Sequence, residues 1–280
     1  MNIKTLADST CDLSPELVAQ YDIEIIPLRI VMDGVPYKDG EEITPTSIFD
    51  YVDGGKGICH TTAVNIEEYI EVYRQSLKTY DAVVHLTISS DFSACYQNAC
   101  IAAQEFENVY TIDSRNLSTG MGHLVIDAAQ MAKQGIEPAE IKKILEETST
   151  RLESSFVINT LKYLHKGGRC SKVAALGANL LQLKPCIEVV NGKMDVGKKY
   201  RGSFEKAIKQ YVDDRLKDRD DLDYKRIFIT HTCSNMELVN SVAEMVQQVG
   251  PFEETIISFA GCTISNHCGP NCLGILFYRK

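Results

Sequence analysis

Serine and threonine residues follow three apolar segments of this 280-residue chain at the point where each segment ends. The segments Ile3–Ala7, Val83–Ile88 and Asn108–Ile112 are typical of buried strands, and the chain continues after them as DST, SSDFS and DS. Ligands of open α/β sheets lie beyond the carboxyl ends of the strands, and parallel strands bring such ends to one edge. The sequence therefore predicts a binding site for a polar group at this edge.

Ser93 is the strongest single candidate among these hydroxyls. It precedes a segment with helical spacing that runs to Phe106, and we expect it to be the N-cap of that helix. The free N–H groups of a first helical turn and the helix dipole both favour an anion. The simpler alternative is that Ser93 only caps its own helix.

Two further polar stretches supply candidate binding groups. The stretch CHTTAVN is expected to be a turn that carries Thr61 and Thr62, either as binding residues or as capping residues. The stretch SNHCGPN is expected to be a second turn that carries His267, and Gly269 lets the backbone approach a ligand closely.

The chain contains ten cysteines, of which Cys262, Cys268 and Cys272 lie near His267. Their spacing lacks the paired knuckles of structural zinc sites, so no metal site is predicted. A metal-bound structural module stays as an alternative interpretation of this cluster.

Composition and charge limit the classes of function. The net charge of −9 argues against sequence-independent nucleic-acid binding, which requires a basic surface. No apolar run reaches the roughly 18 residues of a membrane-spanning helix, and the beginning of the chain lacks a secretory signal. We therefore expect a cytoplasmic protein without nucleic-acid partners or a membrane segment. Neither a P-loop nor a GxSxG nucleophile motif is present.

The order of the expected elements predicts two domains. Strands and helices alternate in the first half, which indicates an N-terminal α/β domain, residues 1–158, with a mostly parallel sheet and flanking helices. Hairpins mix with helices in the second half, which indicates a C-terminal α+β domain, residues 159–280, with a mixed sheet. Details tested below are a strand at Ile23–Met32, a turn at Asp33-Gly34, a helix at Lys172–Leu181 and a solvated, charge-dense connection at Asp214–Arg226.

Several motifs of the chain, taken together, resemble those of the DegV family. Asp8-Ser9-Thr10-Cys11-Asp12-Leu13 resembles the DSTxDL opening of that family, and SSDFSACYQNA resembles SSxLSGTYQxA. Asp113-Ser114 with the following serine and glycines resembles DSxxxSxGxG, LKYLHKGGR resembles LxYLxKGGR, and NHCGPNCLG resembles HxGPGxxG. These matches run in order from residue 8 to residue 274.

The resemblance implies a DegV-like two-domain α/β fold that holds a long-chain fatty acid, palmitate-like or oleate-like, and needs no cofactor. It implies that the carboxylate is bound by Thr61, Thr62, Ser93, Ala94 and His267. Some members of the family are non-catalytic, acyl-carrying subunits of a bacterial fatty acid kinase, and present the carboxylate to a separate ATP-binding subunit for phospholipid metabolism. The remaining candidates are pocket-lining or partner-docking residues: Ser9, Ser114, Gly120 and Gly269 for the pocket, and Lys166 and Arg169, in an exposed turn, for the kinase subunit.

The chain also departs from the family pattern. The family's TSQP turn is replaced by TTAV at Thr61–Val64, and its SG pair by Ser93-Ala94. An enzyme therefore stays as the alternative to a carrier: either an acyl hydrolase with Ser93 as nucleophile and His267 as base, or a subunit that resembles dihydroxyacetone kinase. Such an enzyme requires a base within hydrogen-bonding distance of Ser93.

Overall fold

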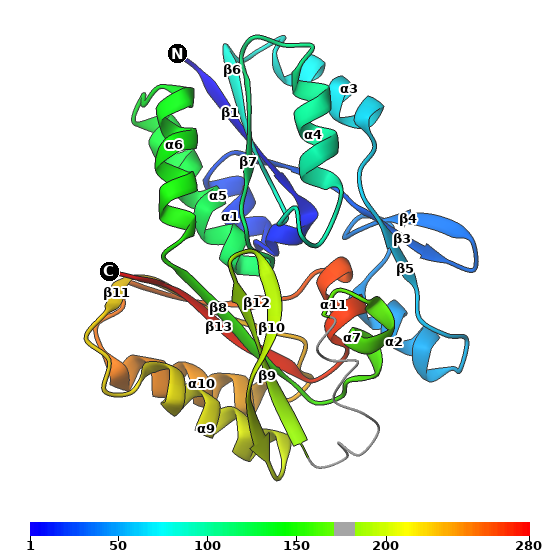
Figure 1. Cartoon of the computed structure of the whole chain (residues 1–280), viewed down its shortest axis with the longest axis vertical. Coiled ribbons are helices and arrows are strands. Elements are labelled where there is room, and N and C mark those ends of the chain that lie inside the picture. Colours follow the sequence, from blue (N-terminus) through cyan, green and yellow to red (C-terminus); the bar gives the residue numbers. More distant parts are fainter. Residues whose placement is uncertain (171–182) are drawn as a thin grey trace.

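The computed structural model describes residues 1–170 and 183–280, and these residues form three sheets (Figure 1). The first is parallel with the strand order β2-β1-β6-β7, the second is mixed with the order β10-β9-β8-β13-β11-β12, and the third is antiparallel with the order β4-β3-β5. The predicted fold class, an α/β protein with a parallel sheet and a mixed sheet, is thus confirmed. The strands are β1 Ile3–Asp8, β2 Ile23–Ile26, β3 Arg29–Met32, β4 Val35–Lys38, β5 His60–Thr62, β6 Ala82–Thr87, β7 Val109–Asp113, β8 Leu152–Ile158, β9 Leu183–Val190, β10 Lys193–Arg201, β11 Leu222–His231, β12 Glu254–Phe259 and β13 Cys272–Arg279.

Helices pack on both faces of the parallel sheet and on the mixed sheet. In Figure 1, α3 and α4 lie on one side of the parallel sheet and α5 and α6 on the other, while α9 and α10 pack on the mixed sheet. The helix expected at Lys172–Leu181 lies outside the described residues. The helical segments are η1 Ser9–Cys11, α1 Pro15–Gln20, α2 Pro45–Asp53, α3 Ile66–Ser76, α4 Cys95–Ala103, α5 Ser118–Lys133, α6 Pro138–Ser149, α7 Lys162–Gly167, α9 Phe204–Leu216, α10 Met236–Val249 and α11 Cys262–Cys268.

Helix α5 lies between the two large sheets and is buried on nearly all sides. It packs on β1 and β6 of the parallel sheet and on β8, β11 and β13 of the mixed sheet. A Cβ atom at Gly120 would overlap the Asn116 and Ser154 side chains, and one at Gly122 would meet the Cys11 carbonyl oxygen and Leu13. These glycines therefore permit close packing of α5, which explains why the helix contains small residues on its crowded faces.

The predicted strand at Ile23–Met32 is wrong as one element, because it forms two strands in different sheets. Strand β2 pairs in parallel with β1, whereas β3 pairs antiparallel with β4 and β5. Pro27 lies between the two strands and has no N–H to donate to a ladder. The turn at Asp33-Gly34 is confirmed, with φ angles of 52° and 80° that suit a two-residue hairpin.

The charge-dense connection at Asp214–Arg226 is not simply a solvated loop. Its last residues form the beginning of β11, and Arg226 is only 1% exposed. The Arg226 guanidinium contacts Asp127 of α5 at 3.3 Å and Glu254 of β12 at 2.5 Å. The ion pair of Arg226 and Asp127 therefore connects α5 to the mixed sheet.

The predicted domain boundary at residue 158 does not coincide with the point at which the chain passes from the parallel sheet to the mixed sheet. Strand β8 pairs with β9 and β13 at the middle of the mixed sheet, although it lies within residues 1–158 of the predicted N-terminal domain. A division by sheets would fall between α6 and β8.

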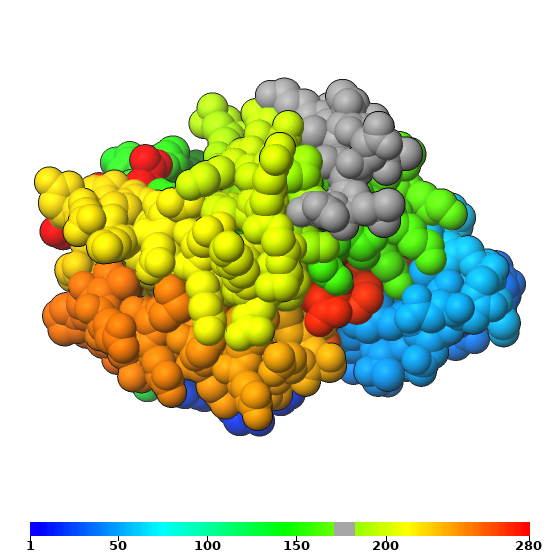
Figure 2. Space-filling view, turned by 90° about the horizontal axis from the view of Figure 1, so that it is seen from below, coloured from blue at the N-terminus to red at the C-terminus, as the bar shows by residue number. Residues whose placement is uncertain are grey.

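In Figure 2 the yellow and orange surface, which contains α9 and α10, adjoins the light-blue surface, which contains α2.

Replacing Asp127 with alanine should destabilise the protein by about 3 kcal/mol, because it leaves the buried Arg226 without its α5 partner. Asp127 also accepts hydrogen bonds from Lys225 and from the Tyr278 hydroxyl, both at 2.9 Å. Urea unfolding followed by circular dichroism measures the loss. The control is Glu254→Ala, whose carboxylate is 39% exposed and whose loss should cost less than about 1 kcal/mol. Equal losses for the two variants would contradict the anchoring role of Asp127.

Candidate functional site

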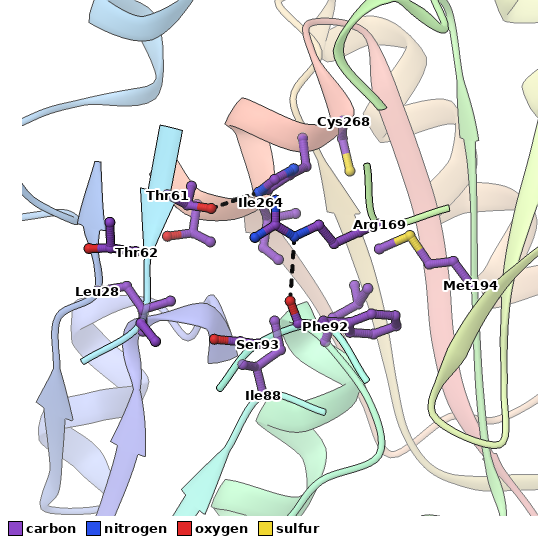
Figure 3. A pocket seen from close by; sticks show the side chains of 14 residues that line it. Leu28, Thr61, Thr62, Ile88, Phe92, Ser93, Arg169, Met194, Ile264 and Cys268 are labelled. Atoms are coloured by element: carbon purple, nitrogen blue, oxygen red, sulfur yellow. Dashed lines mark hydrogen bonds between the residues drawn. The ribbon is translucent and has the colours of Figure 1, made fainter. Parts of the chain in front are cut away.

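A buried cavity of about 40 Å³ lies where the three sheets meet, and both polar and apolar side chains line it. In Figure 3, Thr61 and Arg169 reach toward one another from opposite sides, with Ser93 below them. The polar lining residues are Thr61, Thr62, Ser93, Arg169, Thr263 and His267. The apolar lining residues include Leu28, Ile88, Phe92, Leu117, Met194 and Ile264.

Helix α11 carries four of the lining residues, and two buried carboxyl groups hold its N-terminus. Asp39 accepts hydrogen bonds from the backbone N–H of Cys262 at 2.9 Å and of Thr263 at 3.1 Å. Asp12 accepts from the N–H of Gly261 at 2.9 Å. Asp39 is also bonded by the Ser9 hydroxyl at 3.0 Å, so Ser9 supports the helix and does not line the cavity.

His267 was expected in a turn, but it lies in the last turn of α11, where α7 packs against it. A Cβ atom at Gly167 would overlap the His267 ring, so the first glycine of the KGGR motif allows the two helices to touch. Gly269 has φ = 76° and its missing side chain leaves room for the Tyr163 ring. Gly269 therefore allows close packing of the protein on itself and does not line the cavity.

The His267 ring orients a hydroxyl toward the cavity. Its Nε2 lies 3.0 Å from the Thr61 Oγ1, and its Nδ1 is buried without a hydrogen-bond partner. Burial, and to a lesser extent the Arg169 guanidinium, lowers the pKa of His267 to about 4, so the ring is neutral at pH 7. A buried N–H without a partner is costlier than a bare lone pair, so we assign the hydrogen to Nε2. Thr61 then accepts from His267 and keeps its own proton for a ligand.

Ser93 lines the cavity but is not the N-cap of α4 as predicted. The cap position is Ala94 and the helix begins at Cys95. The Ser93 Oγ accepts from the Cys95 N–H at 3.3 Å and donates to the Cys95 Sγ at 3.1 Å, a weak acceptor that a ligand oxygen can replace. Ala94 is exposed and outside the cavity lining. Because His267 bonds Thr61, the structure does not pair Ser93 with a base as the hydrolase alternative requires.

The other predicted hydroxyls at the strand ends form hydrogen bonds within the protein and do not line the cavity. The β1, β6 and β7 ends are neighbours at one edge of the parallel sheet, as predicted. The Ser114 hydroxyl bonds the Asn116 carbonyl oxygen at 3.1 Å, and Ser89 bonds the carbonyl oxygen of Gly192 at 2.8 Å. Neither Ser114 nor Gly120 lines the cavity. Among the three strand ends, only the one after β6 places a hydroxyl, that of Ser93, in the lining.

Thr61 and Thr62 lie in strand β5, so the predicted turn at this stretch is wrong. The strand pairs antiparallel with β3, with Thr61 opposite Ile30 and Thr62 opposite Arg29. This pairing brings Leu28, next to Arg29, into the same cavity. A three-residue strand without apolar alternation gives almost no signal in a sequence, which explains the error.

An outer cavity of about 430 Å³ adjoins the buried one and shares Thr61, Arg169 and His267 with it. Its remaining polar or charged side chains are those of His60, His165 and Lys166, and no carboxylate is among its lining residues. Lys166 lies in α7 and not in the predicted turn. The sequence analysis did not identify His60, His165 or Thr263, and it assigned Arg169 to docking only.

The cysteines near His267 do not gather around a common point. The Cys262 Sγ donates to the Ile43 carbonyl oxygen at 3.2 Å, while the Cys268 side chain lines the buried cavity. Within residues 1–170 and 183–280, no three His, Cys, Asp or Glu side chains form a set that could hold a metal ion.

The chain is similar to a protein family and to several solved structures. A family model described as an uncharacterised protein of the DegV family, COG1307, matches residues 2–280. A DegV domain-containing protein of Caldanaerobacter subterraneus subsp. tengcongensis is 32% identical over 280 residues, which is 99% of each chain. A DegV family protein from Thermus thermophilus, whose structure is described by its fatty acid binding, is 30% identical and has a TM-score of 0.89 over 100% of both chains. DegV from Bacillus subtilis, described as a fatty acid binding protein, is 27% identical with a TM-score of 0.85, also over 100% of both chains.

We predict that the His267 ring is neutral at pH 7, carries its hydrogen on Nε2 and takes up a second proton only as the pH falls toward 4. In the unfolded chain a histidine has a pKa of about 6.5. The unfolded state therefore binds the proton first, and this residue makes the free energy of unfolding decrease as the pH falls from about 6.5 to about 4. Long-range ¹H–¹⁵N spectra of the histidine rings measure both properties, with His267→Gln to identify the signal. A hydrogen on Nδ1, or titration near pH 6.5, would contradict the assignment.

Proposed function

We propose that this chain, which belongs to the DegV family, binds a long-chain fatty acid and holds its carboxylate at Thr61, Thr62 and Ser93. The observation that carries the proposal is a cavity lined both by hydroxyl groups with an arginine and by apolar side chains. His267 acts as an orienting group for Thr61 and not as a base. The fatty acid binding described for the Thermus thermophilus and Bacillus subtilis proteins supports the same ligand here.

The polar side of the cavity meets the main energetic demand of such a ligand. An ionised carboxylate is very costly to bury unless donors replace the water that it loses. The three hydroxyls supply hydrogen bonds, and the guanidinium of Arg169 supplies a positive charge at the same wall. Arg169 is itself held by the carbonyl oxygens of Gly167, at 2.7 Å, and Phe92, at 3.5 Å.

Apolar side chains next to the cavity would surround the acyl chain. The cavity lining joins a large apolar cluster that includes Leu6, Phe156 and Ile187, with members from both large sheets. Burying the methylenes of a palmitate-like chain gains on the order of 12 kcal/mol, which lies within the range of several to about 15 kcal/mol that ordering the ligand costs. Tight binding therefore requires nearly complete burial of the acyl chain. A cavity of 40 Å³ holds little more than about one water molecule, so side chains such as Met194 must move to admit the chain.

We further infer that the chain presents the carboxylate to a separate, ATP-binding fatty acid kinase subunit for acyl phosphate formation. The outer cavity supports this proposal, because its lining groups are cationic or titratable to cations and include no carboxylate. An anionic phosphoryl donor, or an acidic surface of the partner, would find complementary charge there although the whole chain carries −9. The orienting role of His267 and the missing base beside Ser93 favour this carrier over an acyl hydrolase.

No cofactor enters this proposal, and the predicted cytoplasmic location stays a prediction. None of the helices among the described residues has the length and apolarity that a bilayer crossing requires.

The protein purified from a bacterial host should carry a fatty acid in near-stoichiometric amount, which native mass spectrometry and organic extraction detect. The double variant Thr62→Ala/Ser93→Ala should be largely depleted of it, because two donors to the carboxylate are gone. Ser90→Ala is the matched control, since Ser90 lies on the same loop and its hydroxyl bonds Asp113 instead of lining the cavity. A wild-type protein that is empty and takes up neither palmitate nor oleate rules out the carrier function and favours the enzyme alternative.

Lys166→Glu should abolish acyl phosphate formation by an added ATP-binding kinase subunit while leaving palmitate affinity unchanged. Lys166 lines the outer cavity alone, whereas Arg169 lines both cavities, so Arg169→Glu should lower lipid affinity as well. Acyl phosphate is trapped with hydroxylamine and quantified, and lipid affinity is measured separately by titration. Lys162→Glu, on the same helix outside both linings, is the control. Kinase-dependent turnover that survives in Lys166→Glu would contradict docking at this surface.

A further inference from the structure

Thr263 is a buried residue of α11 that lines the inner cavity and has an unpaired hydroxyl. It is 4% exposed, and its Oγ1 has no hydrogen-bond partner. Its backbone N–H is bonded to Asp39, so the main chain of the residue is satisfied and only the side-chain oxygen is not. A buried hydroxyl without a partner is unusual in folded proteins and indicates a group that is absent from the protein itself.

The helix does not satisfy this hydroxyl in the ordinary way. Serine and threonine side chains within helices commonly donate to a carbonyl oxygen three or four residues earlier. A neighbour on the same helix makes a closely similar bond, since the Ser265 hydroxyl donates to the Ala260 carbonyl oxygen at 2.9 Å. Thr263 makes no such bond, so its proton remains free for an acceptor on the cavity side.

The position of Thr263 relative to His267 places this hydroxyl near the expected head group. The two residues are four apart on one helix face, which brings their Cβ atoms to within about 6 Å. Thr61, Arg169 and His267 line both cavities, whereas Thr263, like Ser93, lines only the inner one. Thr263 therefore belongs to the inner cavity alone, next to the residues that the two cavities share.

We propose that the Thr263 hydroxyl donates a hydrogen bond to an oxygen at the carboxyl end of the acyl ligand, an inference that rests on the proposed fatty acid binding. A carboxylate accepts about four hydrogen bonds, and Thr61, Thr62 and Ser93 supply three of them. The acceptor is a carboxylate oxygen or, in a 2-hydroxy fatty acid, the hydroxyl on the adjacent carbon. In either case Thr263 is a further ligand-binding residue of this site.

The test compares palmitate and 2-hydroxypalmitate binding to the wild type, Thr263→Val and Thr263→Ser by calorimetric titration. Valine keeps the shape and removes the hydroxyl, so affinity should fall about 10- to 150-fold, the change expected for one lost hydrogen bond to a charged group. Serine keeps the hydroxyl and should stay within about threefold of the wild type. A loss restricted to 2-hydroxypalmitate assigns the acceptor to the chain hydroxyl, and a loss for both acids assigns it to the carboxylate.

The melting temperature of the ligand-free variants shows whether a change in affinity reflects misfolding. Removing an unpaired buried hydroxyl should leave Thr263→Val at least as stable as the wild type. Affinity of Thr263→Val equal to or above that of the wild type for both acids would overturn the inference while leaving the proposed function intact. A wild type that binds neither acid overturns the proposed function, and this inference with it.

Discussion

Two buried carboxyl groups accept hydrogen bonds from the N-terminus of α11, and these bonds determine the geometry of the site. Asp39 comes from the segment after the β3–β4 hairpin, and Asp12 follows the 3₁₀ turn after β1, so the clamp joins the small sheet to the parallel sheet. Burial raises the pKa of the Asp12 carboxyl to about 8, because its bonds to Ser118 and Gly261 offset only part of the solvation that it loses. From this fixed end, the helix carries Thr263, Ile264 and His267 along one wall of the cavity.

Several motif residues that suggest ligand contacts in the sequence belong to this clamp instead. Ser9 of the DSTCDL motif bonds Asp39 at 3.0 Å, and Ser118, from the motif that contains the α5 glycines, bonds Asp12 at 2.5 Å. A buried carboxyl group needs such donors as much as a bound fatty acid would. Residue type alone therefore could not distinguish a hydroxyl that binds a ligand from one that holds a helix.

The sequence was informative where a local pattern decides the structure. The alternation of strands and helices predicted the parallel sheet, and Asp33-Gly34 predicted the turn between β3 and β4. It failed where tertiary contacts decide, as at β5, which is a strand only because β3 pairs with it. Within the site, Thr61, Thr62, Ser93 and His267 were predicted and line one cavity. Thr263 was missed because a threonine in an apolar stretch has no signal until its helix is placed and its oxygen is found without a partner.

The two cavities differ in how they would stabilise negative charge in the proposed carrier. Inside, a neutral histidine and hydroxyl groups would hold the carboxylate mainly by hydrogen bonds, which avoids burying several full charges together. Outside, the more exposed Lys166 provides positive charge, and none of the described residues that line this cavity carries a carboxylate. Arg169 lies between them and lines both, so among the described residues it is the one permanent cation in the lining of the inner cavity. This arrangement would bind the head group firmly enough to retain the lipid, yet keep one side of it next to a surface that favours a second anion.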